Sequence, residues 1–134
     1  MSKLMKMRRY KINIPDPNFR YYLMEYFDHD GNNYLTNLDC LSIKTISCSF
    51  RGIKSMSGIE YFPNLETLFC IGNEFPELIL DNHRKLKILC CFSDKLEKLV
   101  LSDCPNLVDL QCSGKNLRNL DLSNCKNIRN SVLL

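Results

Sequence analysis

The sequence predicts a solenoid of short parallel strands, stacked in a mostly β right-handed coil behind a small α-helical N-terminal cap. One observation is that a unit of 21 residues occurs three times in succession between Leu65 and Asn127. The other is that apolar residues occupy the same positions in every unit. Repetition at a fixed period of this size is typical of chains whose units stack and share one continuous core.

Each unit has two halves of similar apolar spacing, Leu-x-x-Leu-x-Cys and then Leu-x-x-Leu-x-Leu. The first halves begin at Leu65, Leu86 and Leu107, and the second halves begin at Phe75, Leu96 and Leu117. An earlier copy begins at Ile43, and a fifth copy begins at Ile128. We therefore divide the chain into a basic arm and cap region, residues 1–42, and residues 43–134, which hold four full repeats and one partial repeat.

This pattern resembles the 21-residue nested class of bacterial leucine-rich repeats over about two thirds of the chain. The asparagine that this class carries three positions after the cysteine is present as Asn73, whereas Arg51, Asp94 and Lys115 replace it elsewhere. The resemblance implies a leucine-rich repeat solenoid that serves as a non-catalytic scaffold for a protein or peptide partner. A fold alone does not identify that partner.

The eight cysteines are expected to be free thiols, because most of them follow the repeat. Cys48, Cys70, Cys91 and Cys112 are spaced by 22, 21 and 21 residues, in the phase of an inward leucine. A free cysteine behaves as a small apolar residue in a core. Stacked parallel side chains fit disulfide geometry poorly. The sequence contains no Cys-x-x-Cys pair, so a zinc site is not predicted. Cys104 and Cys125, one period apart in a turn, are the pair to watch for oxidation.

The net charge of +3 is modest, and its distribution disfavours a nucleic-acid partner. Five of the 18 Lys and Arg residues precede residue 12, which leaves 13 basic residues against 15 acidic ones in the body. No run is long enough for a membrane span, and no apolar stretch follows the basic N-terminus as in a signal peptide. We therefore expect no membrane partner and a cytoplasmic, reducing location, or export if an upstream signal has been removed.

The first 42 residues are expected to form a cap over the first repeat. Residues 1–14 predict a flexible basic arm, which includes Lys3 and Lys6. A helix is predicted to start at Pro15-Asp16-Pro17-Asn18, with Asp16 or Asn18 as its N-cap. Its apolar stripe consists of Phe19, Tyr22, Leu23, Tyr26 and Phe27. Thr36 is expected to cap a short second helix that leads to the first strand.

The segment between these two helices resembles the calcium loop of an EF-hand. The ligand positions fall on Asp28, Asp30, Asn32, Tyr34, Thr36 and Asp39. The resemblance departs from the motif at Asn33, where glycine is usual, and at Asp39, where glutamate is usual. Two interpretations stay open: a weak structural calcium site, and a capping turn that keeps the loop shape without an ion, which we favour. No other cofactor is expected.

A binding surface is predicted on the concave strand face, where alternate residues of each strand point to solvent. The outward positions of successive strands are Thr45, Ser47 and Ser49; Thr67, Phe69 and Ile71; Ile88, Cys90 and Phe92; Asp109, Gln111 and Ser113. The central positions are apolar and have polar neighbours on both sides, which is typical of a protein contact. Alternatively, Ile71 and Phe92 fill the turn, or the N-terminal arm covers the patch. The outward residues of the second halves, including Glu77, Ile79 and Asp81, are expected to form a solvated mixed surface.

Three function classes remain open. The favoured one is a protein-interaction scaffold that uses Phe69, Ile71, Ile88, Cys90, Phe92, Asp109 and Gln111. The second is a structural repeat module, a fragment of a longer surface protein, that self-associates through its uncapped C-terminal repeat. The third is a thiol enzyme using an exposed Cys90, which we disfavour because neither His29 nor His83 has a partner at a fixed spacing. We therefore expect a chain that is not an enzyme.

Overall fold

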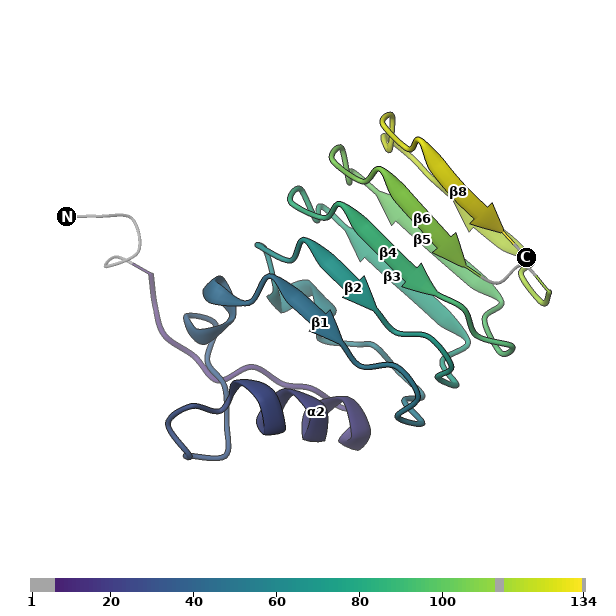
Figure 1. Cartoon of the computed structure of the whole chain (residues 1–134). Helices are drawn as coiled ribbons and strands as arrows, with labels where there is room; N and C mark the ends of the chain where they lie inside the picture. The colour runs from purple at the N-terminus through teal and green to yellow at the C-terminus, as the bar shows by residue number, and fades with distance from the viewer. Residues whose placement is uncertain (1–6, 113–114, 134) are drawn as a thin grey trace.

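The computed structural model describes residues 7–112 and 115–133. It forms a solenoid in which successive coils place short parallel strands side by side (Figure 1). The front sheet contains β1 (Thr45–Ser47), β2 (Thr67–Phe69), β4 (Ile88–Cys91), β6 (Asp109–Cys112) and β8 (Asn130–Leu133). The back sheet contains β3 (Glu77–Asp81), β5 (Lys98–Ser102) and β7 (Asn119–Asp121). The prediction of a parallel-strand solenoid with a small helical cap is confirmed.

The register of the strands reproduces the period of the sequence. Leu68 pairs with Leu89, and Leu89 pairs with Leu110 in the next coil. These leucines are fully buried, and each such side chain stabilises the fold by about 1.5–3 kcal/mol relative to an exposed one. The four repeat cysteines are fully buried as well, and all eight cysteines are free. The expected ladder of inward thiols is therefore present.

The turns after the back-sheet strands require a left-handed backbone once per coil. Asn82, Asp103 and Asn124 have φ angles of 60°, 54° and 56° and are spaced by the repeat length. Asparagine and aspartate tolerate this conformation better than other residues with a side chain, because their short polar groups bond locally. The repeated Asx residue follows directly on the ends of β3 and β5 and lies three residues beyond the end of β7.

Asn73 joins the first two coils at the opposite turn. Its Oδ1 accepts hydrogen bonds from the backbone N–H groups of Arg51 and Ile53, both at 3.0 Å. Its Nδ2 donates to the carbonyl oxygens of Cys48 and Cys70, at 3.0 and 3.2 Å. In the next coil the Ser93 hydroxyl donates to the Asn73 carbonyl at 2.7 Å and continues the ladder. One buried amide thus satisfies four backbone groups.

The helix α2 (Pro17–Phe27) packs on the first coil and begins at the predicted N-cap, Asp16. One carboxylate oxygen of Asp16 accepts from the N–H groups of Asn18 and Phe19, both at 2.9 Å. The helix covers the outer edge of the front sheet, where the Ser47 N–H donates to the Tyr22 hydroxyl at 2.8 Å. The predicted stripe extends too far, because Tyr26 is exposed and lies between Arg51 and the ring of Tyr22 at the margin of the core.

Two single-turn 3₁₀ helices follow α2: η1 (Asp39–Ser42) connects the cap to β1, and η2 (Ile59–Tyr61) lies within the first coil. The expected second helix is therefore reduced to η1. The prediction that Thr36 caps it is wrong, because the N-cap is Leu38 without a side-chain capping bond; the Thr36 hydroxyl accepts from the Asp39 N–H at 3.3 Å, in the turn before η1. The η2 turn lies in the part of the first coil where later coils form a back-sheet strand.

The N-terminal segment is held where the sequence predicted flexibility. The Tyr10 N–H donates to Asn37 Oδ1 at 2.8 Å, and the Ile12 N–H donates to the Leu35 carbonyl at 3.0 Å. Ile14 is buried against the first coil. The arm prediction is therefore wrong for residues 10–14, whereas Lys3 and Lys6 lie outside the described residues. In the described part of the chain, no helix has the length and apolar character that a membrane span requires.

Candidate functional site

The outward side chains of the front sheet form two rows that the strand register defines. The first row is Thr45, Thr67, Ile88, Asp109 and Asn130, and the second row is Ser47, Phe69, Cys90, Gln111 and Val132. Figure 1 shows no helix or loop of the described residues in front of this face. The face is therefore open to a partner. Ser113, also predicted to point outward, lies outside the described residues.

The apolar residues at the centre of these rows are partly shielded by their neighbours. Phe69, Ile71, Ile88 and Phe92 are half-buried, so Ile71 and Phe92 neither point fully outward nor fill the turn completely. Cys90 is only 7% exposed, which makes the prediction of an exposed thiol wrong. Its side chain is short and lies between Phe69 and Gln111 in its row. Burial, with a smaller effect of the Asp109 carboxylate, raises the pKa of Cys90 and keeps it a neutral thiol at neutral pH.

The polar side of this face lies on β6. Gln111 and Asp109 are half-buried, and the Gln111 side-chain amide donates to Asp109 Oδ1 at 3.3 Å. On the other side, Thr45 and Ser47 are exposed on β1. The apolar centre therefore lies between a hydroxyl-bearing strand and a strand with a carboxylate and an amide. A polar rim of this kind around an apolar centre is typical of protein contacts.

Phe50 extends the apolar surface and was missed in the sequence. It is 77% exposed, the most exposed of the large apolar side chains in the described residues. It occupies a left-handed position with φ 58°, and its ring lies where a Cβ at Gly72 would be, 2.3 Å from the nearest ring carbons. Gly72 is one coil further along the chain and is also left-handed, so comparing these equivalent positions could have drawn attention to Phe50.

The EF-hand-like loop forms a hydrogen-bonded turn. The Asp28 carboxylate accepts from the N–H groups of Asn32 and Asn33, at 3.2 and 2.8 Å. One oxygen of Asp39 accepts from the N–H and the hydroxyl of Thr36, at 2.8 and 3.1 Å. Asp30 and Tyr34 are exposed. Within the described ranges, no three His, Cys, Asp or Glu side chains are grouped as a metal site requires. The carboxylates of Asp28 and Asp39 therefore stabilise the shape of the loop through hydrogen bonds within it.

Burial shifts the pKa values of Cys48, Cys104 and His83 toward their neutral forms. Burial raises the pKa of Cys104 to about 11 and the pKa of Cys48 to about 12. His83 is buried and its Nε2 lies 3.1 Å from the Ile59 carbonyl oxygen. Burial lowers the pKa of His83, so its imidazole stays neutral. Reactive cysteines need a stabilised thiolate, which these surroundings oppose.

The chain matches no protein-family model and no curated protein sequence. Among solved structures it is similar to the crystal structure of internalin C2 from Listeria monocytogenes, with 16% sequence identity and a TM-score of 0.44. That alignment covers 90% of this chain and 94% of the other chain.

Proposed function

We propose that this chain is a non-catalytic interaction module that binds a protein or peptide partner on the open face of its front sheet. The observation that carries this proposal is the apolar centre of that face, Phe69, Ile71, Ile88 and Phe92, which no element of the described chain covers. Phe50 adds an exposed aromatic ring at the end of the sheet. Aromatic and branched apolar side chains surrounded by polar groups contribute most of the binding energy in many protein interfaces.

The rows also determine the character of the partner surface. The short side chain of Cys90 leaves a shallow depression between Phe69 and Gln111. The Asp109 carboxylate is partly accessible next to Ile88. A matching partner presents an apolar centre and hydrogen-bond donors toward β6. Because the strands are rigid and parallel, the partner docks on a preformed surface, which lowers the entropic cost of binding.

The experiment compares the wild-type chain with a Phe69→Asp/Phe92→Ser variant as immobilised baits in extract of the source cells. Proteins retained by the wild type and lost from the variant support the proposal. The matched control is Val100→Ser, which removes an outward apolar side chain from the back sheet. It is expected to retain the same proteins. Equal retention by all three baits contradicts binding at this face, and a collapsed melting temperature of the double variant shows that its residues are core instead.

A further inference from the structure

The back sheet starts without an edge-covering strand. β3 is its first strand, because the first coil contains the η2 turn and an irregular segment at this position. The edge of the front sheet differs, since α2 packs there and Tyr22 accepts the N–H of Ser47. An uncovered strand edge presents a row of free N–H and C=O groups, which is a template for another strand.

The pairing of β3 with β5 shows which groups are free. The Asn82 N–H donates to the Ser102 carbonyl, and the Pro76 carbonyl accepts from Lys98, so these even-numbered positions face β5. Successive residues of a strand direct their backbone groups to alternate edges, and therefore Glu77, Ile79 and Asp81 face away from β5. Within the described residues, no hydrogen bond engages the N–H groups of these three residues on that side.

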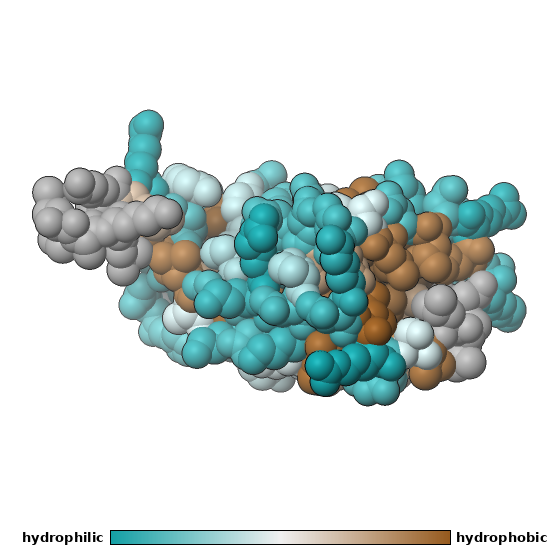
Figure 2. Space-filling model, turned by 90° about the horizontal axis from the view of Figure 1, so that it is seen from above, coloured by the Kyte–Doolittle hydropathy of each residue, from teal (hydrophilic) through white to brown (hydrophobic). Residues whose placement is uncertain are grey.

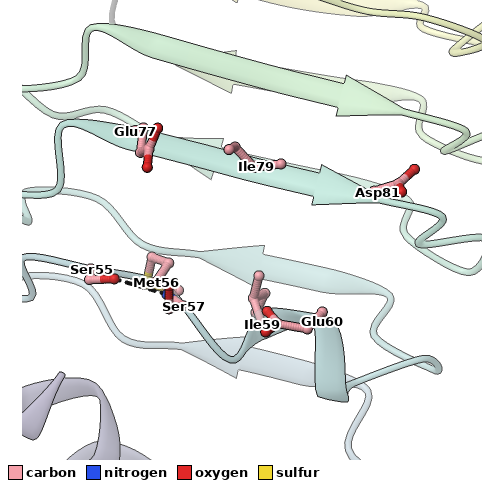
Figure 3. A pocket seen from close by; sticks show the side chains of 8 residues that line it. All are labelled: Ser55, Met56, Ser57, Ile59, Glu60, Glu77, Ile79 and Asp81. Carbon is pink, nitrogen blue, oxygen red and sulfur yellow. Dashed lines mark hydrogen bonds between the residues drawn. The ribbon is translucent and has the colours of Figure 1, made fainter. Parts of the chain in front are cut away.

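A groove of about 330 Å³ lies along this free edge. Figure 3 shows Glu77, Ile79 and Asp81 on the strand and, across the groove, the side chains of Ser55, Met56, Ser57, Ile59 and Glu60. The groove is closed at one end by the Glu74 N–H, which donates to the Ile53 carbonyl at 2.7 Å. The contact of His83 Nε2 with the Ile59 carbonyl closes the other end. Between these two points, no backbone hydrogen bond joins the first coil to β3 within the described residues.

The charge of the groove is entirely acidic. Glu60, Glu77 and Asp81 are exposed on its walls, and no Lys, Arg or His lines it. None of these carboxylates forms an ion pair with the residues that the structure describes. Lys98 lies beside Glu77 in the sheet but outside the groove. The Ile79 side chain, 46% exposed, separates the two carboxylates of β3.

We propose that this groove binds an extended basic peptide segment of a partner protein, which pairs with β3 as an added strand of the back sheet. Backbone bonds to Glu77, Ile79 and Asp81 provide the affinity, and alternate side chains provide the specificity. Every second residue of the bound peptide then lies beside an outward side chain of β3. These peptide residues are basic beside Glu77, apolar beside Ile79 and basic beside Asp81. The peptide residues between these three positions are small, because the side chains of Met56 and Ile59 fill the space beneath them.

The probe is a fluorescein-labelled peptide with the core lysine-serine-valine-serine-lysine, titrated with the full chain and measured by anisotropy. Saturable binding is expected, with NMR shifts at the amides of Ile79 and Asp81. A Glu77→Lys/Asp81→Lys variant is expected to weaken binding on the order of tenfold and to favour the peptide with glutamate in place of lysine. Unchanged preference in this variant overturns the charge argument.

Backbone pairing is tested separately with proline. Ile79→Pro removes an N–H that faces the groove and leaves the ladder with β5 intact, since proline is tolerated on an edge strand. It is expected to weaken binding on the order of tenfold, whereas Ile79→Ala retains it within about threefold. Leu120→Pro is the control, because it likewise removes an N–H that faces away from β5, on β7 at the opposite edge of this sheet.

These measurements distinguish peptide binding in the groove from partner binding on the front-sheet face. The Phe69→Asp/Phe92→Ser variant is expected to bind the peptide like the wild type, so failure of the function proposed for that face does not affect this test. Two results overturn strand addition: no saturable binding up to about 1 mM peptide, and equal binding by folded Ile79→Pro and Ile79→Ala. If Ile79→Pro does not fold, the amide shifts and the charge-reversal variant decide the question.

Discussion

Single buried polar side chains hold the coils of this solenoid together. Asn73 is the clearest case, because all four of its hydrogen bonds go to backbone groups of two coils. An aliphatic side chain at this position would leave these groups unsatisfied in a buried turn, where each lost partner costs about 1–3 kcal/mol. The energetic effect of one residue is therefore large here.

We predict that Asn73→Ala lowers the free energy of unfolding by about 3 kcal/mol, because the turn loses its buried bonds. Urea denaturation with an unchanged m-value measures this change. Asn116→Ala is the control, since the Asn116 amide bonds the Asp94 carbonyl at an exposed turn and its loss costs less than about 1 kcal/mol. Equal effects of the two substitutions would contradict the role of burial.

His83 is predicted to make stability depend on pH. Its pKa in the folded state lies below the ordinary value of 6.5, mainly because burial disfavours the imidazolium. The unfolded chain therefore binds more protons below pH 6.5, so the free energy of unfolding falls as the pH falls from that value toward the folded-state pKa. Melting temperatures measured from about pH 7 to about pH 5 should show this loss, and His83→Gln should reduce it. His29→Gln, at an exposed site, should leave the loss unchanged.

At the scale of elements, the cap is joined to the repeats through Asp16. While one carboxylate oxygen caps α2, the other accepts from the N–H groups of Lys54 and Ser55, at 2.9 and 3.2 Å. Asp16 is buried, so water replaces these bonds poorly. The same side chain therefore starts the helix and fixes the helix on the first coil.

We predict that Asp16→Ala lowers the melting temperature by roughly 10 °C, because it removes an N-cap and leaves two further N–H groups unsatisfied. Asp16→Asn retains an oxygen acceptor and should lose less. Differential scanning calorimetry gives both values, with the exposed Asn18→Ala as the control. Asn18→Ala removes only one exposed hydrogen bond, to the Gly52 carbonyl, so a drop as large as that for Asp16→Ala would contradict the special role of Asp16.

The loop before η1 is expected to keep its shape without calcium, because Asp28 and Asp39 already accept hydrogen bonds within the turn. Addition of calcium to about 10 mM should therefore shift the melting temperature by less than about 1 °C. A weak structural site would instead show a rise of several degrees that magnesium does not reproduce. Asp30→Asn would abolish that rise, since Asp30 is an exposed carboxylate of the loop.

At the scale of the whole molecule, the two ends differ. The first coil is covered by α2, whereas apolar side chains are exposed on the last strands, with Leu120 44% and Val132 41% accessible. Seen from above, most of the hydrophobic surface lies toward the C-terminal end (Figure 2). An apolar strand edge of this kind favours association with another chain.

We therefore predict that the chain self-associates through this end. Light scattering coupled to size exclusion should show a mass that rises with concentration. Leu120→Lys/Val132→Lys should shift the chain toward the monomer, because charge on an edge strand opposes pairing. Thr45→Lys/Ser47→Lys, on the covered first strand, is the control and should leave the mass unchanged. A strict monomer at high concentration contradicts the prediction.

The repeat by itself determined the architecture of this chain. Period and phase predict parallel strands, inward leucines and the file of buried thiols, because stacking is the one arrangement that buries the same positions in every coil. The N-cap at Asp16 was also predictable, since it depends on residues adjacent in sequence.

Only the tertiary structure decided the features that depend on contacts between distant segments. Cys90 is buried by its row neighbours in other coils, and the segment at Tyr10 is held by residues about 27 positions away. The groove beside β3 exists because the first coil forms η2 where a strand would pair. The sequence around Glu77, Ile79 and Asp81 repeats like the others, so its local pattern carries no sign that its neighbour is missing.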